Sequence, residues 1–373
     1  MTRALVIGVQ PQSLTNFRGD LIRALRSAGV RVTAMAEPAP PREVAAIEAL
    51  GCDFRPYPVR RNSLAPAADV QTLRALRRAV RETKPDLVLA YTIKPVIWGG
   101  LALRGVPDVR FLALITGLGF AFQGEGLSRR ALTELVVRLY RAALWRADAV
   151  IFQNTGNRDE FLARRIVPAE KCHIVDGSGV DTGAFAVTPL SVAAGTRFLL
   201  IARLLGEKGI REYVEAAAIV RARHPATEFH LVGPADPSPD GIPLPEVEGW
   251  HAAGTIRYHG EAKDVRPFIA ESHIYVLPSY HEGMPRTVLE AMAMGRPILT
   301  TDVPGCRETV VQAENGWLVP KADAKALAER MIWFIENRDQ WERMGAASRR
   351  IAVERFDVRK INAEMLRIMG VTA

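Results

Sequence analysis

The chain has 373 residues, 48% of them hydrophobic, so we expect two domains or one large one. No apolar run approaches the ~20 residues of a membrane-spanning helix, so we expect no transmembrane helix. The start shows no signal-peptide pattern, and Cys52, Cys172 and Cys306 lack CxxC spacing, which indicates a reducing cytoplasm and argues against a structural zinc site. The net charge of +8 comes from the first half, since residues 1–186 carry 26 Lys or Arg against 17 Asp or Glu, whereas the remaining 187 carry 23 against 24.

In the first half, short β-rich runs alternate with amphipathic helical patterns. This alternation predicts βαβ units, and hence a parallel sheet covered by helices on both faces. In chain order the predicted strands are 4–9, 31–36, 52–59, 85–92, 111–116 and 148–153, and the predicted helices are 16–29, 41–50, 67–84 and 128–147.

A second series of the same kind follows a segment, 179–195, whose Gly, Pro, Thr and Ala suit a linker. The two halves therefore repeat one architecture, which predicts an α/β fold of two doubly wound, Rossmann-like domains facing a central cleft. Ligands of such sheets bind beyond the carboxyl ends of the strands. The second series comprises strands 196–204, 228–233, 255–260, 273–279 and 296–301, helix 209–224 and a Pro-rich surface loop, 234–245.

Two familiar nucleotide motifs are absent. TGLGFAF and GSGVDTG only approach the G-x-G-x-x-G fingerprint of dinucleotide-binding proteins. The chain contains no Asp-x-Asp, which a transferase holding its sugar nucleotide through a metal normally shows. We therefore expect no metal and no resident cofactor.

The segment HEGMPRTVLEAM (281–292) follows strand 273–279, so it lies at a carboxyl end. Pro285 favours a helix start, and Gly295 ends the predicted helix, about 285–294. Glu282 then precedes the helix and Glu290 lies inside it, with the N–H groups of 283–286 as an anion site between them. This arrangement fits a sugar nucleotide. One acid would contact the hydroxyls of the sugar, the N–H groups would contact the diphosphate, and the other acid would contact the ribose.

An alternative is that Glu282 caps the helix and Glu290 is a solvated surface residue. The apolar neighbours of Glu290 disfavour it, because an unpaired carboxylate among them is costly. A second motif also favours the ligand site: Arg203 and Lys208 follow the strand ending in RFLLI, again at a carboxyl end. Two cations beside a helix start can bind a diphosphate, although each alone would be taken for surface charge.

The R-x4-K-G segment (Arg203, Lys208, Gly209) and the E-x7-E segment (Glu282, Glu290) together resemble the retaining glycosyltransferases of family 4. PILTTDVPGCRETV and NGWLVP are similar to the same family, and the resemblance spans essentially the whole chain. It implies a metal-independent GT-B enzyme.

By that resemblance, residues 1–185 with a crossover helix in 357–373 form the acceptor domain, and 186–356 form the nucleotide-sugar domain. Arg203 and Lys208 would bind the diphosphate, and Glu290 the ribose. Glu282 and the Gly283–Met284 backbone would face the donor sugar, and 305–309 would form the floor below the phosphates.

The first half resembles a narrower group of that family, which adds sugars to lipid-linked oligosaccharides for bacterial capsule, O-antigen or protein glycans. The matching segments are NFRGDLIRALRSAG, YTIKPVIWGGLA and ITGLGFAF. They imply a UDP-sugar donor, carrying a hexose or N-acetylhexosamine, and an undecaprenyl diphosphate saccharide as acceptor. Many relatives have a His in the loop reading ITGLG here, where Thr116 is the nearest match, so we assign no His-based catalysis. The predicted cleft residues are Asn16, Tyr91, Lys94, Thr116 and Gly117.

Retention is attributed in this family to front-face attack, in which the leaving diphosphate helps to take the acceptor proton. Arg203 and Lys208 would then be the main catalysts, because they stabilise departing charge. A double displacement needs a carboxylate near the anomeric carbon, and Glu282 is the one candidate.

Helix 128–147 carries Leu132, Leu135, Val136, Leu139 and Leu144 together with Arg129, Arg130, Arg138, Arg141 and Arg146. One interpretation is an amphipathic helix that packs on the sheet. The other adds docking to an anionic membrane at its inner, cytoplasmic face, with GLGFAF (117–122) dipping in.

Other interpretations stay open at this point. A GT-B enzyme with a soluble sugar acceptor would show the same motifs. A basic first half can also indicate a non-enzymatic nucleic-acid-binding protein, but no recognition motif supports this and we expect no nucleic-acid partner. An Arg-rich genome would give the same excess without functional meaning.

Overall fold

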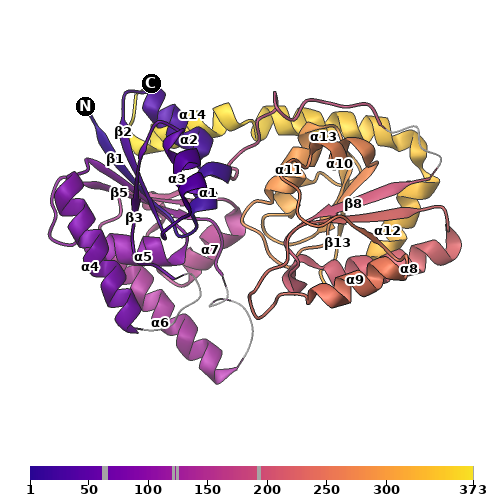
Figure 1. Cartoon of the computed structure of the whole chain (residues 1–373), viewed down its shortest axis with the longest axis horizontal. Helices are drawn as coiled ribbons and strands as arrows, with labels where there is room; N and C mark the ends of the chain where they lie inside the picture. Colours follow the sequence, from indigo (N-terminus) through magenta and orange to yellow (C-terminus); the bar gives the residue numbers. More distant parts are fainter. Residues whose placement is uncertain (61–65, 120–121, 123–125, 191–194, 373) are drawn as a thin grey trace. The chain divides into compact units, whose positions relative to one another are not determined.

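The computed structural model describes residues 1–60, 66–119, 122, 126–190 and 195–372 (Figure 1). The chain forms two compact units. Unit 1 comprises Met1–Ser178 and the C-terminal residues from Lys360 onward, and unit 2 comprises Gly179–Arg359. The sequence places these boundaries after residues 185 and 356, so the unit limits differ by a few residues.

Unit 1 is built on a seven-stranded parallel sheet in the order β3-β2-β1-β4-β5-β6-β7. Helices follow most strands, which is the arrangement that parallel strands require. The strands are β1 (Arg3–Ile7), β2 (Arg31–Ala36), β3 (Asp53–Pro56), β4 (Leu87–Tyr91), β5 (Arg110–Ile115), β6 (Ala149–Phe152) and β7 (Cys172–Ile174). The helices are α1 (Pro11–Asn16), α2 (Gly19–Ser27), α3 (Pro41–Glu48), α4 (Pro66–Thr83), α5 (Ile93–Ala102), α6 (Leu127–Leu144), α7 (Thr155–Ala163) and α14 (Val358–Met369).

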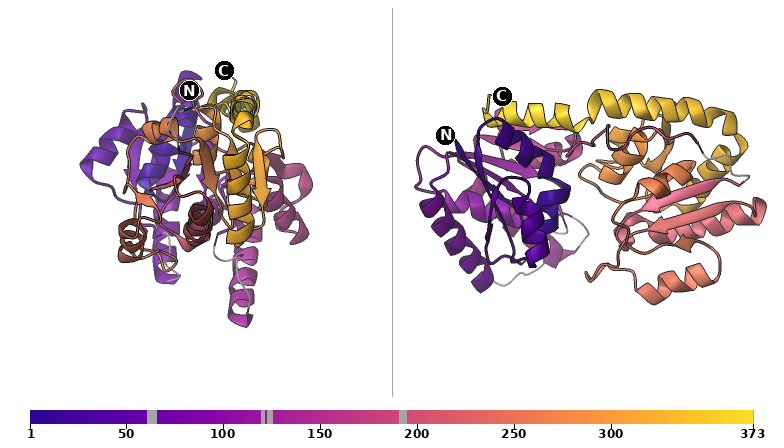
Figure 2. Two further views of the ribbon diagram at one scale, coloured as in Figure 1. Left: turned by 90° about the vertical axis from the view of Figure 1, so that its right-hand side faces the viewer. Right: turned by 45° about the horizontal axis from the view of Figure 1, so that its top comes forward.

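Helices cover both faces of this sheet because alternate strand residues point to opposite sides. Leu5 and Ile7 of β1 pack with α4, α5, α6 and α7. Ala4 and Val6 face the other core, which α2, α3 and the C-terminal α14 complete. Figures 1 and 2 show α14 beside α2 on this face, so the end of the chain belongs to the first unit.

Unit 2 has a six-stranded parallel sheet in the order β10-β9-β8-β11-β12-β13. Phe198 and Leu200 face a core with α8, α9 and α12. Leu199 and Ile201 face a core with α10, α11 and α13. The strands are β8 (Arg197–Ile201), β9 (Glu228–Val232), β10 (Arg257–Tyr258), β11 (Ile274–Leu277), β12 (Ile298–Thr301) and β13 (Gly316–Val319). The helices are α8 (Ile210–Arg223), α9 (Leu244–Ala252), α10 (Arg266–Glu271), α11 (Arg286–Ala293), α12 (Ala324–Glu336) and α13 (Trp341–Arg355).

All the predicted strands occur, and the two doubly wound α/β sheets are confirmed. The helix predicted over 16–29 corresponds to α2, which begins at Gly19, and the short α1 before it is not predicted; Phe17 and the buried Arg18 lie between the two helices. Helix α5 is not predicted from the sequence, because its run IKPVIWGGLA has no regular polar face. This helix is covered on both sides, and a Cβ at Gly100 would lie 2.4 Å from the carbonyl oxygen of Ala143 on α6.

Candidate functional site

The sheet of unit 2 has one point at which the winding of the chain reverses. It lies between β8 and β11, which are neighbours in the sheet although they are distant in sequence. The chain leaves such strands in opposite directions, and the crevice at their carboxyl ends is the usual ligand site of open α/β sheets. Arg203 follows β8 and Glu282 follows β11, so both lie at this switch point.

Lys208 and Glu282 are in direct contact at the switch point. Lys208 ends a 3-10 turn, Gly206–Lys208, and Gly209 then adopts a left-handed conformation with φ of 68°. A Cβ at Gly209 would lie 2.0 Å from the carbonyl oxygen of Pro278, so this turn requires glycine. The Lys208 Nζ lies 2.7 Å from Glu282 Oε1, and these side chains are 13% and 15% exposed. The structure thus joins two predicted site residues that are 74 positions apart.

Arg203 forms an ion pair with Asp236, a residue that the sequence analysis does not single out. Asp236 belongs to the Pro-rich loop after β9, for which the sequence predicts only a surface position. In the same loop, Asp240 Oδ2 accepts a hydrogen bond from the Glu207 N–H at 2.8 Å. The loop therefore contacts the segment that carries both predicted cations. The only sequence signal for this role is two aspartates among prolines.

Glu290 lies inside α11 and is only 6% exposed, so the alternative of a solvated surface carboxylate is wrong. Its Oε1 accepts a hydrogen bond from Arg286 Nε at 2.9 Å, one turn earlier. Burial raises the pKa of Glu290 above its ordinary value, although the charge and hydrogen bond of Arg286 oppose this. Helix α11 begins at Arg286, one residue later than predicted, with Pro285 as its N-cap.

The segment 305–309, predicted as a floor, packs against the loop that carries Glu282. A Cβ at Gly305 would lie 2.5 Å from the carbonyl oxygen of Glu282, so glycine permits this close approach. The Gly305 N–H donates to Glu308 Oε2 at 2.7 Å, which fixes the turn. Gly283 and Met284, the next residues of the Glu282 loop, are half-buried.

His281 is a further polar residue of this loop that the sequence analysis misses. Its Nε2 is buried and has no hydrogen-bond partner among the residues that the structure describes. Burial lowers the pKa of His281 below its ordinary value, so the ring is neutral near pH 7. Within the ranges that the structure describes, no cluster of three or more His, Cys, Asp or Glu side chains could hold a metal ion.

Unit 1 has its own switch point between β1 and β4, where Tyr91 ends β4. The Tyr91 hydroxyl lies 2.7 Å from Ser13 Oγ, and the guanidinium of Arg18 lies over its ring, 5.0 Å from the centroid. Burial raises the pKa of Tyr91 to about 12, against the hydrogen bond of Ser13 and the charge of Arg18. A Cβ at Gly8 would lie 2.1 Å from the Tyr91 hydroxyl, so β1 and β4 end in close contact.

The other predicted residues of unit 1 lie around the carboxyl ends of its strands. Lys94, on the first turn of α5, forms an ion pair with Asp69 of α4 at 2.8 Å. Thr116 and Gly117 follow β5 and are half-buried, and Asn16 is exposed at the end of α1. No hydrogen bond or ion pair joins Lys94 to these other predicted residues within the described part of unit 1.

Comparison with known families decides what these two units are. Residues 15–176 match the "Glycosyl transferase 4-like domain" family, and residues 195–337 match "Glycosyl transferases group 1". Together the two matches cover most of the chain, one in each unit. The chain is a glycosyltransferase of this group 1, family 4-like class. Among the described residues of this glycosyltransferase, no helix is long and apolar enough to span a bilayer.

Curated relatives of the glycosyltransferase include bacterial enzymes of glycan assembly. The N,N'-diacetylbacillosaminyl-diphospho-undecaprenol alpha-1,3-N-acetylgalactosaminyltransferase of Campylobacter jejuni is 26% identical over 87% of both chains. The putative glycosyltransferase EpsD of Bacillus subtilis is 25% identical over 82% of this chain and 81% of its own.

Solved structures share the fold along the whole chain. HepE of Anabaena, in complex with UDP, aligns with a TM-score of 0.80 at 20% identity and covers 100% of both chains. Sucrose-phosphate synthase of Thermosynechococcus elongatus aligns with the same TM-score at 20% identity, over 99% of this chain and 98% of its own. The glycosyltransferase therefore has the GT-B fold, as predicted.

Proposed function

We propose that this glycosyltransferase moves a hexose or N-acetylhexosamine from a UDP sugar to an undecaprenyl diphosphate-linked saccharide during bacterial surface polysaccharide or glycan assembly. The observation that carries the proposal is the meeting of Lys208 with Glu282, beside Arg203, at the switch point of a unit that matches glycosyl transferases group 1. The lipid-linked acceptor is supported by the activity named for the Campylobacter jejuni relative, and UDP by the HepE complex.

In the proposed complex, Arg203 and Lys208 bind the diphosphate, and Glu290 accepts hydrogen bonds from the ribose hydroxyls. Glu282, with the backbone of Gly283 and Met284, faces the donor sugar. Glu282 is half of an ion pair with Lys208, so it can orient the cation as well as accept a sugar hydroxyl. Carboxylates suit hydroxyl donors, and paired cations suit a diphosphate.

The proposed reaction retains the anomeric configuration by front-face attack. The bond between the anomeric carbon and the β-phosphate oxygen breaks, and the acceptor oxygen forms the new bond on the same face. The acceptor proton passes to the departing phosphate oxygen. Lys208 and Arg203 accelerate this step because negative charge on the leaving group grows in the transition state. Glu282 forms no covalent intermediate in this scheme, and no metal is required because the two cations stabilise the leaving charge.

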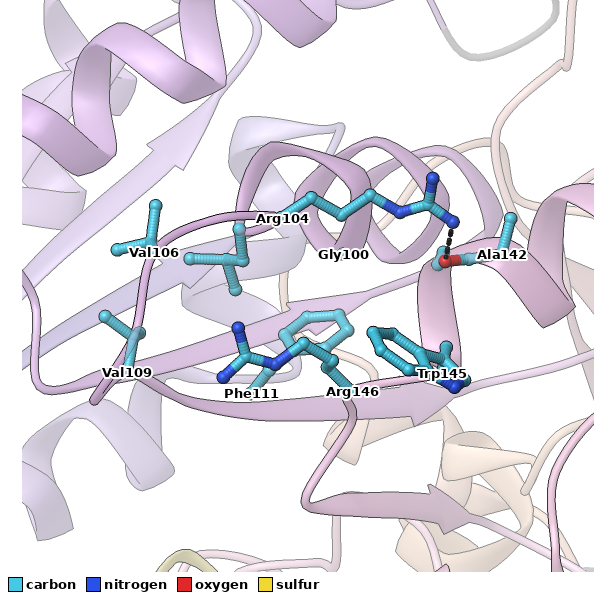
Figure 3. Close-up of a pocket in the computed structure, with 10 residues that line it drawn as sticks. Gly100, Arg104, Val106, Val109, Phe111, Ala142, Trp145 and Arg146 are labelled. Carbon is cyan, nitrogen blue, oxygen red and sulfur yellow. Dashed lines mark hydrogen bonds between the residues drawn. The ribbon is translucent and has the colours of Figure 1, made fainter.

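A membrane surface is proposed as the place where the acceptor is met. On α6, Leu135 is 55% exposed and Arg138 is exposed, whereas Leu144 is buried. Only some of the apolar side chains predicted on this helix are therefore exposed to solvent. Figure 3 shows Trp145 and Arg146 at the end of α6, and Trp145 is 74% exposed. Exposed apolar and basic side chains on one helix, with an exposed aromatic residue directly after it, favour an anionic bilayer surface.

Part of the predicted membrane contact lies outside the described residues. In GLGFAF this applies to Phe120 and Ala121, and the side chain of Arg129 is likewise not described. The pocket in Figure 3 lies where β5 begins, at the edge of the sheet opposite to Tyr91 and Thr116. We therefore assign no acceptor contact to it.

The proposal is tested with purified protein in two steps. A thermal-shift screen against nucleotide sugars identifies the donor, and transfer is then assayed with lipid diphosphate saccharides and with the same saccharides free of lipid. Transfer only to the lipid-linked form supports the proposed acceptor. Transfer only to the free saccharide would replace it with the soluble-acceptor alternative, and no thermal shift with any nucleotide sugar would refute the donor assignment.

A further inference from the structure

The loop 234–243 after β9 runs alongside the segment that carries Arg203 and Lys208. The Leu204 N–H donates to the carbonyl of Pro234 at 2.9 Å, and the Ile242 N–H donates to the carbonyl of Leu204 at 2.9 Å. The Gly206 N–H also donates to the carbonyl of Asp240 at 2.9 Å. The loop is thus attached to residues 204–206 by backbone hydrogen bonds at both of its ends.

These backbone hydrogen bonds hold the loop so that Asp236 lies against Arg203. Its Oδ1 accepts the Ser238 N–H at 2.9 Å, and its Oδ2 contacts Arg203 Nη1. The Asp236 side chain is 10% exposed, whereas that of Arg203 is 39% exposed, so the carboxylate is the more enclosed partner. Burial opposes ionisation of Asp236, but the hydrogen bonds of Ser238 and the charge of Arg203 prevail and hold its pKa below the ordinary value.

The same guanidinium is the one assigned to the diphosphate under the proposed function. A bound diphosphate and Asp236 are both anionic, so they compete for Arg203 or repel each other across it. The competition is strongest for the product, because the terminal phosphate of UDP ionises further once it no longer carries a sugar. A clamp that stabilises the leaving group also tends to retain it.

We propose that Asp236 is a positioning residue that competes with the diphosphate for the guanidinium of Arg203. By this competition it weakens binding of the product and speeds release of the nucleoside diphosphate. This inference rests on the proposed function, since it needs Arg203 to contact the diphosphate. When UDP leaves, the guanidinium returns to the carboxylate instead of remaining without a counter-ion at the switch point.

The test substitution is Asp236→Asn, which keeps an oxygen for the Ser238 N–H and removes the charge. We expect the Kd of UDP, measured by titration calorimetry, to fall about three- to tenfold, as for loss of a half-exposed charge contact. The Kd of uridine, which has no phosphate, should not change. Glu246→Gln is the matched control: it removes a carboxylate from an Arg211 ion pair in the same unit, and it should leave both affinities unchanged.

A second background shows whether the effect passes through Arg203. In Arg203→Gln, adding Asp236→Asn should no longer tighten UDP, because the competition has been removed. In turnover, Asp236→Asn should lower the product inhibition constant of UDP and reduce kcat and donor KM together, because slower release of the product lowers both. A merely structural role would instead weaken uridine and UDP together. Asp236→Ser repeats the test if Asp236→Asn fails to fold.

The outcomes separate the two proposals. If the wild type does not bind UDP or any other nucleoside diphosphate, the proposed function fails. If the wild type binds UDP and Arg203→Gln weakens it, but Asp236→Asn leaves UDP affinity unchanged or reduces it, only the role of Asp236 is overturned. Equal tightening by Asp236→Asn in both backgrounds would also overturn it.

Discussion

Replacing Glu290 with Ala should weaken nucleotide binding through the ribose. The Glu290 side chain is 8% exposed and its Oε1 lies 2.9 Å from Arg286 Nε, so the carboxylate is oriented before any ligand arrives. Loss of a charged hydrogen-bond acceptor costs about 1.5–3 kcal/mol, which corresponds to a roughly 10- to 150-fold higher Kd for UDP. Arg286 is 29% exposed and can be hydrated after the change, so the helix should persist.

The assay compares UDP with 2′,3′-dideoxy-UDP by titration calorimetry. The wild type should bind the dideoxy ligand more weakly than UDP, and Glu290→Ala should bind both alike, because the hydroxyls then have no carboxylate to meet. Glu314→Ala removes the carboxylate of another Glu–Arg pair in unit 2 and serves as the control. Unchanged UDP affinity in Glu290→Ala, or undiminished discrimination between the ligands, would refute the ribose assignment.

Further predictions address catalysis, metal, membrane and pH. Lys208→Ala should lower kcat more than donor affinity, because leaving-group charge grows in the transition state; an unchanged kcat with weaker donor binding would indicate a binding role only. Transfer should continue in excess EDTA, and strict dependence on Mg²⁺ or Mn²⁺ would contradict the proposed mechanism. Neutralising Arg129, Arg130 and Arg138 together should weaken binding to anionic vesicles, measured by flotation, by roughly 2–3 kcal/mol without changing UDP affinity. A wild type that does not bind such vesicles at low salt would contradict the docking proposal. Because the pKa of Glu290 is raised in the folded state, the unfolded chain loses this proton first. The free energy of unfolding of the wild type, compared with that of Glu290→Gln, should therefore fall as the pH rises from the ordinary pKa of Glu to the raised pKa of Glu290. A rise in this difference, measured by chemical denaturation over the same pH range, would contradict the prediction.

The sequence predicts the switch-point residues because strong local patterns place them. Buried apolar runs define β8 and β11, and residues directly after parallel strands share one edge of the sheet, so Arg203 and Glu282 lie at the same edge. The partner of Glu290 is also local, since Arg286 is one helical turn away.

Asp236 could not be predicted in the same way. It lies 33 positions from Arg203, in a Pro-rich loop without periodicity, and its role depends on backbone hydrogen bonds between that loop and residues 204–206. The late start of α2, at Gly19 rather than at residue 16, has a related reason: the periodicity continues through Arg18, whereas the burial of that side chain is a tertiary property. Contacts made across the fold decide what local patterns leave open.

In the proposed reaction, the cations of unit 2 promote transfer of a sugar from a UDP sugar to a lipid diphosphate saccharide. The most direct measurement is transfer of radiolabelled sugar to an undecaprenyl diphosphate saccharide, with wild type and Lys208→Ala side by side and the anomeric configuration of the product determined by NMR. We expect a retained configuration, and a turnover that is much lower in the variant than in the wild type. An inverted product, or equal turnover by the two proteins, would contradict this expectation.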